Sequence, residues 1–410
     1  MMDMLLIKNA TLATAHGCTP AAGAAQHTTV TVTENASVLI NGDTIQTVYG
    51  SGEAPSFECD NVIDAEGRLV TAGLVDAHTH LIFGGWRQHE VPLKLKGASY
   101  LEILQAGGGI LNTLKATRAA SEDELFDKAA KVLEEMLHHG VTTVEAKSGY
   151  GLDAENELKQ LRVIRRLAHE GGYNVVPTFM AAHAVPLEFS GDPDGYIEHI
   201  CTKILPLVAD DELCEFVDIF CETGVFNVEQ SRKMLQYAQM YGFKTKIHAD
   251  EIDAIGGSKL AGEIGAVSAE HLIAIDDDGI ASMAKGGTIA CLLPGTSLYL
   301  GKDFAPARKM VEAGVPVAVC TDFNPGSCPS CNLQLCMNLA LLRYKLTPQE
   351  VLTAVTLNAA CAVDRANVCG TVENGKRADL VIWDAPDLDY LVYRMGSNLA
   401  STVIKGGKTV

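Results

Sequence analysis

The chain has 410 residues, of which 47% are hydrophobic and 20% charged, a balance typical of a globular protein. A formal net charge of −19, with no run rich in Lys or Arg, argues against binding to nucleic acid or to an anionic membrane surface. No apolar run approaches the ~18 residues of a membrane span, and the N-terminus lacks the features of a signal peptide. We therefore expect a cytoplasmic protein.

The two ends of the chain alternate apolar and polar residues, a pattern that predicts β-strands. Asn41-Gly42 lies between two such segments and predicts a hairpin turn. We expect residues 1–72 and 365–410 to form one small β-sandwich domain. Its predicted strands are 5–13, 29–33, 37–49, 62–70, 378–383 and 402–410.

Residues 73–364 alternate predicted strands with amphipathic helices, which favours an α/β fold. A short buried strand before His78 is the first of eight. The other predicted strands are 141–146, 174–181, 217–221, 245–248, 266–270, 287–293 and 315–320, and helices between them include 122–138, 154–170 and 228–241. Eight such units predict a (β/α)₈ TIM-type barrel.

A doubly wound open sheet is the alternative for this region. The chain has neither a Gly-x-Gly-x-x-Gly turn after a first strand nor a phosphate-loop motif, which disfavours it. We interpret the glycine run at 107–109 as a loop hinge.

The run Asp76-Ala-His-Thr-His80 is the most informative feature of the chain. Side chains alternate along a strand, so His78 and His80 project to the same side at the strand's end. Two imidazoles there form half of a metal site, and imidazole is a ligand for zinc and iron.

Polar residues recur at the ends of the other predicted strands, where barrel enzymes place their active sites. They are Glu145, Lys147 and Tyr150 at the second strand, His183 at the third, His248, Asp250 and Glu251 at the fifth, Glu270 and His271 at the sixth, and Asp322 and Asn324 at the eighth. A single buried histidine is often a satisfied core group. Four histidines and an aspartate at separate strand ends instead predict a metal-dependent site.

These residues resemble the metal-site motifs of the amidohydrolase superfamily. The matching segments are Asp76-Ala-His-Thr-His80, Ile247-His248-Ala-Asp-Glu251, Glu270-His271 and Thr321-Asp322-Phe-Asn-Pro-Gly326. Within the superfamily, further segments resemble the imidazolonepropionase family. They are Phe83-Gly-Gly-Trp-Arg-Gln-His-Glu90, Gly107-Gly-Gly-Ile110, Ala116-Thr-Arg-Ala-Ala120, Lys147-Ser-Gly-Tyr-Gly151, Ala182-His183 and Asp322-Phe-Asn-Pro-Gly-Ser327.

The resemblance extends over nearly the whole chain. It implies a (β/α)₈ barrel with a small β-sandwich made from both chain ends. It also implies hydrolysis of the ring of 4-imidazolone-5-propanoate to N-formimidoyl-L-glutamate in histidine degradation, and a homodimer.

The resemblance further assigns one metal ion, zinc or iron, to His78, His80, His248 and Asp322. Two-metal relatives carry a carboxylated lysine at the end of the fourth strand. Here that strand ends in Asp218-Ile-Phe-Cys-Glu222, without a lysine, so one divalent or trivalent ion per chain is expected. Lys147 belongs to the second strand, and we interpret it as an ion-pair partner.

Three side chains are predicted to move or hold protons. His271 is the candidate general base, with orientation of the water as the alternative. Asp322 is expected to pass a proton to the leaving ring nitrogen. Glu251 is expected to accept hydrogen bonds from a ring N–H or, alternatively, to orient His248.

The substrate's propionate needs a cationic partner. By itself Arg87 would be read as a surface ion pair, but the family motif points to a bidentate partner for this carboxylate, with Tyr150 adding a hydroxyl donor. His183 is expected to contact the ring carbonyl. The loop residues Asn324, Gly326 and Ser327 resemble those that bind the formimidoyl-glutamate end.

Two other functions remain open at this point. A deaminase of a purine or pyrimidine ring would share the metal residues, but its neutral substrate would give Arg87 and Tyr150 no carboxylate to bind. A barrel retained as a non-catalytic scaffold is the second alternative. The sequence argues against it, because a ligand residue is present at every metal position.

Overall fold

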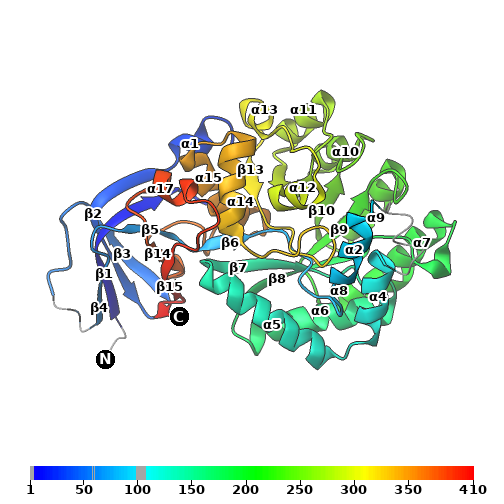
Figure 1. The fold of residues 1–410 in the computed structure, drawn as a ribbon, viewed down its shortest axis with the longest axis horizontal. Helices are drawn as coiled ribbons and strands as arrows, with labels where there is room; N and C mark the ends of the chain where they lie inside the picture. The colour runs from blue at the N-terminus through cyan, green and yellow to red at the C-terminus, as the bar shows by residue number, and fades with distance from the viewer. Residues whose placement is uncertain (1–3, 58, 60, 98–107) are drawn as a thin grey trace.

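The computed structural model describes residues 4–57, 59, 61–97 and 108–410, so Gly107 of the predicted hinge lies outside the described residues. Eight parallel strands form one sheet in chain order, β6 to β13 (Figure 1). They are β6 Leu74–Asp76, β7 Val141–Lys147, β8 Asn174–Ala182, β9 Phe216–Cys221, β10 Lys244–Ala249, β11 Ser268–His271, β12 Ile289–Leu292 and β13 Val317–Val319. The predicted barrel is confirmed.

The first and last strands of this sheet meet just beyond their carboxyl ends. Thr79 forms a parallel bridge with Phe323. The Asp322 N–H donates to the His78 carbonyl at 3.1 Å, and the His80 N–H donates to the Phe323 carbonyl at 2.9 Å. This closure joins the segment of His78 and His80 directly to that of Asp322.

Helices surround the barrel, and three of them match predicted ranges closely. α5 Glu122–His138 has its predicted bounds, whereas α6 Ala154–His169 and α9 Val228–Met240 each end one residue earlier. α5 begins where Ser121 forms a capping box with Glu124, which satisfies backbone N–H groups at the helix start.

The remaining α-helices among the described residues are α1 Ala25–Thr28, α2 Val91–Leu95, α4 Ile110–Ala119, α7 Pro193–His199, α8 Leu205–Asp210, α10 Gly257–Ile264, α11 Asp277–Gly286, α12 Pro294–Leu300, α13 Ala307–Glu312, α14 Leu333–Leu339, α15 Pro348–Val355, α16 Leu357–Ala362 and α17 Leu388–Tyr393. Across the described part of the chain, no helix combines the length and apolar character that a membrane crossing requires.

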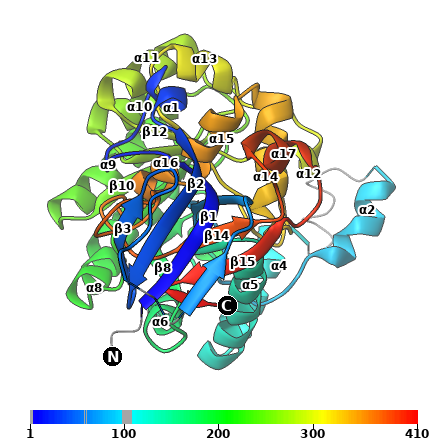
Figure 2. The same ribbon diagram turned by 90° about the vertical axis from the view of Figure 1, so that its left-hand side faces the viewer.

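Both chain ends join a second sheet, which Figure 2 shows facing the viewer. Its strands are β1 Met4–Thr14, β2 Thr31–Asn41, β3 Thr44–Tyr49, β4 Asn61–Asp64, β5 Leu69–Ala72, β14 Leu380–Trp383, β15 Ala400–Lys405 and β16 Lys408–Thr409. β14 pairs antiparallel with β5 and thereby joins the C-terminal strands to the N-terminal ones. This sheet has its own core, including Ile7, Val38 and Leu380.

The predicted hairpin in this sheet is present, although shifted by one residue. Asn41 still pairs with Thr44, so the turn consists of Gly42 and Asp43. Gly42 has a φ of 62°, which glycine adopts without steric cost. The division of the chain after residues 72 and 364 remains our proposal, supported by the separate core of the second sheet.

Candidate metal centre and active site

Four histidines and one aspartate converge at the carboxyl end of the barrel. They are His78, His80, His248, His271 and Asp322, none more than 5% exposed. Nε2 of His80 lies 3.3 Å from Nε2 of His248. The Asp322 Oδ1 atom lies 3.4 Å from Nε2 of His78 and 3.7 Å from Nε2 of His80. The structure thus brings together all four predicted metal ligands and the predicted base.

These distances suit a metal ion. Zinc ligands at bond lengths of ~2.0–2.1 Å in a tetrahedron have donor atoms about 3.3 Å apart. The buried Nε2 atom of His78 has no hydrogen-bond partner in the described part of the chain. Burial lowers the pKa of His78 and His80 well below the ordinary value and that of His248 to about 3, so the rings are neutral and offer lone pairs.

Two overlapping sets of side chains could hold the ion, and they share His78. One consists of His78, His80 and Asp322, and the other of His78, His248 and His271. His271 therefore lies close enough to be a ligand as well as a base. The sequence motifs did not indicate this second possibility.

Two carboxylates set the orientation of the histidine rings. Nδ1 of His78 lies 2.8 Å from Glu270 Oε2, and Nδ1 of His248 lies 3.0 Å from Asp218 Oδ2. With Nδ1 directed at a carboxylate, each ring presents Nε2 to the cluster. Sequence reasoning missed both pairs, although the alternation of side chains along β9 and β11 places Asp218 and Glu270 on inward-facing positions.

Beneath the histidines lies a network of charges with no solvent exposure. Lys147 Nζ lies 2.9 Å from Glu145 and 2.8 Å from Asp218, and Lys246 Nζ lies 3.0 Å from Glu145. Burial alone would raise the pKa of Asp218, but His248 and Lys147 hold it well below its usual range. The interpretation of Lys147 as an ion-pair partner is confirmed.

Asp322 occupies a strained backbone position at the end of the barrel. Its φ of 57° lies in the left-handed region, which non-glycine residues adopt infrequently. Its Oδ2 accepts a hydrogen bond from Thr296, which leaves Oδ1 facing His78 and His80. Burial raises the pKa of this carboxyl to about 6.

Glu251 faces His271. Its Oε2 lies 3.6 Å from His271 Nε2, whereas the position beside His248 is occupied by Asp218. The arrangement therefore supports a role for Glu251 near the proposed base and gives no support to the alternative in which it orients His248.

Tyr150 and His183 form one side of the site. The His183 ring stacks on the His80 ring with centroids 4.7 Å apart, and the ring centroids of Tyr150 and His183 are 5.2 Å apart. Burial lowers the pKa of His183 to about 4, and its Nδ1 lies 3.1 Å from the Gly149 carbonyl. A neutral ring that donates from Nδ1 has an acceptor at Nε2, which matches a substrate N–H better than the ring carbonyl that we expected.

Arg87 is already paired within its own loop. Its Nε and Nη2 atoms bind the fully buried Glu90 carboxylate at 2.8 and 3.0 Å, and Glu90 also accepts from the Gly109 N–H at 2.6 Å. Nη1 packs against Gly326, where a Cβ would come within 2.1 Å of it. Nη1 is therefore the Arg87 atom directed at the predicted substrate loop. The pairing with Glu90 limits how much of the guanidinium is open to a substrate, and the sequence did not reveal this.

The predicted substrate loop is shaped by Asn324. Its Nδ2 donates to the Asp322 carbonyl and to Ser327 Oγ at 2.7 and 2.8 Å, and its Oδ1 accepts from the N–H groups of Gly326 and Ser327. Because these groups are hydrogen-bonded within the turn, the main role of the Asn324 side chain is to hold the conformation of the loop.

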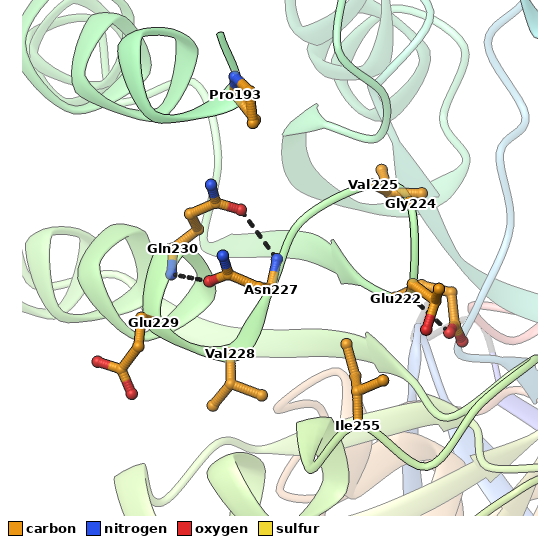
Figure 3. A pocket seen from close by; sticks show the side chains of 10 residues that line it. Pro193, Glu222, Gly224, Val225, Asn227, Val228, Glu229, Gln230 and Ile255 are labelled. Atoms are coloured by element: carbon orange, nitrogen blue, oxygen red, sulfur yellow. Dashed lines mark hydrogen bonds between the residues drawn. The ribbon is translucent and has the colours of Figure 1, made fainter. Parts of the chain in front are cut away.

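A cavity of about 530 Å³ lies next to this end of the barrel (Figure 3). It is lined by Pro193, Val225, Asn227 and Gln230 among others, and by none of the predicted site residues. Its wall includes Glu222, whose carboxylate accepts from the Ile252 N–H at 2.9 Å, directly after Glu251. The cluster of histidines, and not this cavity, defines the candidate site.

Comparison with known proteins agrees with this site. The chain matches the profile of the Amidohydrolase family over residues 69–410. Among solved structures, the 5-methylcytosine deaminase from Klebsiella pneumoniae liganded with phosphonocytosine has a TM-score of 0.75 at 18% identity, covering 99% of this chain and 97% of that one. Atrazine chlorohydrolase TrzN from Arthrobacter aurescens complexed with zinc has a TM-score of 0.72 at 18% identity, covering 99% and 94%. These two likenesses show the fold.

Curated relatives are much more similar in sequence. The imidazolonepropionase of Bacillus cytotoxicus is 51% identical over 380 residues, covering 92% of this chain and 90% of the relative. The imidazolonepropionase of Alkaliphilus metalliredigens is 51% identical over 383 residues, with the same coverage. The chain therefore belongs to the imidazolonepropionase family of the amidohydrolases.

Proposed function

We propose that this chain hydrolyses the ring amide of 4-imidazolone-5-propanoate to N-formimidoyl-L-glutamate, a step of histidine degradation. The observation that carries the proposal is the 51% identity to an imidazolonepropionase over 92% of the chain. The buried cluster of His78, His80, His248 and Asp322 supports it with a site suited to metal-dependent hydrolysis.

The proposal includes one metal ion per chain, zinc or iron, on His78, His80, His248 and Asp322. When bound, such an ion can lower the pKa of a water molecule to about 7 and polarise a carbonyl group. The lone pairs of the three neutral imidazoles and the Asp322 carboxylate are the groups that would hold it.

Proton movement falls to His271, Glu251 and Asp322. His271 accepts a proton from the attacking water, and Glu251, 3.6 Å from its Nε2, stabilises the imidazolium that results. As the carbonyl C–N bond breaks, the proton taken up by His271 passes by way of the Asp322 carboxylate to the leaving ring nitrogen, which restores both side chains to their starting states. Water thus adds across the bond, with its oxygen on the carbonyl carbon and a hydrogen on the nitrogen.

Substrate recognition falls to both sides of the site. Nη1 of Arg87 and the hydroxyl of Tyr150 bind the propionate, and Nε2 of His183 accepts from a ring N–H. The backbone N–H groups of Gly326 and Ser327 already bind Asn324, so the loop supplies mainly its shape at the formimidoyl end. The substrate is a small anion, which makes Arg87 important on a chain of net charge −19. We also propose a cytoplasmic homodimer.

A substrate panel tests the proposal. Metal-loaded protein is incubated with freshly generated 4-imidazolone-5-propanoate, with cytosine and with guanine, and each is followed by its ultraviolet absorbance. We expect turnover of the imidazolone alone. Deamination of a nucleobase without imidazolone hydrolysis would support a deaminase instead, and no turnover of any substrate would support a binding scaffold.

A further inference from the structure

Gln160 connects the two loops that carry Arg87 and Tyr150. This side chain lies on α6 and has no solvent exposure. Its Nε2 donates to the Ile82 carbonyl at 2.7 Å, and its Oε1 accepts from the Tyr150 N–H at 3.2 Å. One amide group thus bonds the start of the Arg87 loop and the backbone of Tyr150 itself.

Each loop also has anchors of its own. In the Arg87 loop, the Gly84 N–H donates to Thr117 at 2.9 Å and the Gly84 carbonyl accepts from Lys128 at 3.0 Å. In the Tyr150 loop, the Glu157 carboxylate accepts from three backbone N–H groups, those of Gly149, Gly151 and Leu152. These contacts tie the Arg87 loop to α4 and α5 and the Tyr150 loop to α6, whereas the Gln160 side chain bonds both loops at once.

Glu157 and Gln160 are three residues apart on α6 and lie on the same face of that helix. The helix therefore presents a rigid pair of side chains to the Tyr150 loop, and the second of them extends to the Arg87 loop. Because both side chains are fully buried, few alternative rotamers are open to them.

We propose that Gln160 is a positioning residue that sets the separation of Arg87 and Tyr150 and thereby the preference of the site for a substrate carboxylate. This inference rests on the proposed function, in which these two residues bind the propionate. A carboxylate bound at once by a guanidinium and a hydroxyl requires both donors at a fixed distance, and a displacement of ~1 Å can weaken such a site strongly.

The variant Gln160→Leu tests the proposal, since leucine keeps most of the volume and removes both hydrogen bonds. We expect the KM for 4-imidazolone-5-propanoate to rise about tenfold or more while kcat changes by less than about threefold. The matched control is Gln334→Leu. Gln334 is also buried and bonds the His139 carbonyl, Asn398 and the Leu399 N–H, away from the candidate site. The Gln334→Leu variant should lose about as much stability as Gln160→Leu, with no change in KM.

A binding measurement isolates the carboxylate. Inhibition constants of imidazole-4-propanoate and of its neutral primary amide are compared by competition or by calorimetry. The unmodified protein should prefer the carboxylate, and Gln160→Leu should lose most of that preference. An equal loss of affinity for the acid and the amide, or a KM shift no larger than that of Gln334→Leu, would overturn the proposal.

A second variant covers the case in which Gln160→Leu does not fold. Gln160→Glu keeps an acceptor for the Tyr150 N–H and loses the donor to Ile82, so it should show the same direction of change in KM and in inhibition. If the unmodified protein binds imidazole-4-propanoate but does not hydrolyse the imidazolone, the proposed function fails while the comparison of inhibitors still decides the role of Gln160.

Discussion

His248 Nδ1 lies 3.0 Å from Asp218 Oδ2, and the same oxygen accepts from Lys147 at 2.8 Å. The carboxylate thus lies between a histidine of the metal cluster and a buried ammonium. This arrangement keeps Asp218 charged and directs Nε2 of His248 towards His80. A carboxylate that orients a metal-binding histidine in this way affects primarily the affinity of the site for the metal.

Replacement of Asp218 by asparagine is therefore expected to weaken metal binding by about 10–100-fold. Competition with a chromophoric chelator measures this without any substrate. Asp379→Asn is the matched control, because Asp379 is buried just before β14 and paired with Arg377 and with Asn174 at the amino end of β8, the end opposite the site. Equal metal affinity in the two variants would refute the positioning role of Asp218.

His271→Ala separates a base from a ligand. As a base, His271 contributes the ~10²–10⁴-fold in kcat typical of general acid–base catalysis, and the variant should keep its metal. Because His271 also forms a possible ligand set with His78 and His248, the metal content is measured on the same sample by elemental analysis. Loss of the metal would make His271 a ligand.

Arg87→Ala is expected to raise KM by about 10–100-fold, the effect of removing one charge-assisted hydrogen bond. The single variant also leaves the buried Glu90 without its bidentate partner, which costs stability. The double variant Arg87→Ala/Glu90→Gln restores much of that stability, so the remaining rise in KM reports on substrate binding. A double variant with an unchanged KM would exclude Arg87 from the substrate site.

The stability of the metal-free protein should depend on His183 under acidic conditions. Burial lowers the pKa of His183 to about 4 from an ordinary value near ~6.5. Between these values the unfolded chain binds a proton that the folded protein does not, so the free energy of unfolding falls as the pH drops. His183→Asn should show a shallower fall between pH ~6.5 and ~4 in urea denaturation. The exposed His138→Asn serves as the control, and equal slopes in the two variants would contradict this assignment.

The sequence was sufficient to predict the barrel and the convergence of His78, His80, His248 and Asp322. Parallel strands of a barrel end at one face, so residues that follow the strands gather there. His78, His80 and Asp322 lie just beyond the ends of β6 and β13. The same reasoning correctly predicted a second sheet from both chain ends.

The partners of the histidines could not be predicted in this way. His248 and Glu270 are in register on neighbouring strands, yet Glu270 binds His78 and Asp218 binds His248. Which inward carboxylate meets which ring depends on the register and tilt of strands that are distant in sequence. The pair of Arg87 and Glu90 depends on a 3₁₀ turn over Gln88–Glu90, which brings residues three apart together and which the sequence pattern did not indicate.

The most direct test of this account measures metal content and imidazolone hydrolysis on one sample, before chelation, after chelation and after addition of zinc or iron. We predict about one metal ion per chain with turnover, no turnover after chelation, and recovery of both together. Hydrolysis that continues in fully chelated protein, or a metal ion restored without any hydrolysis, would contradict the central claim that these four residues form a catalytic metal site.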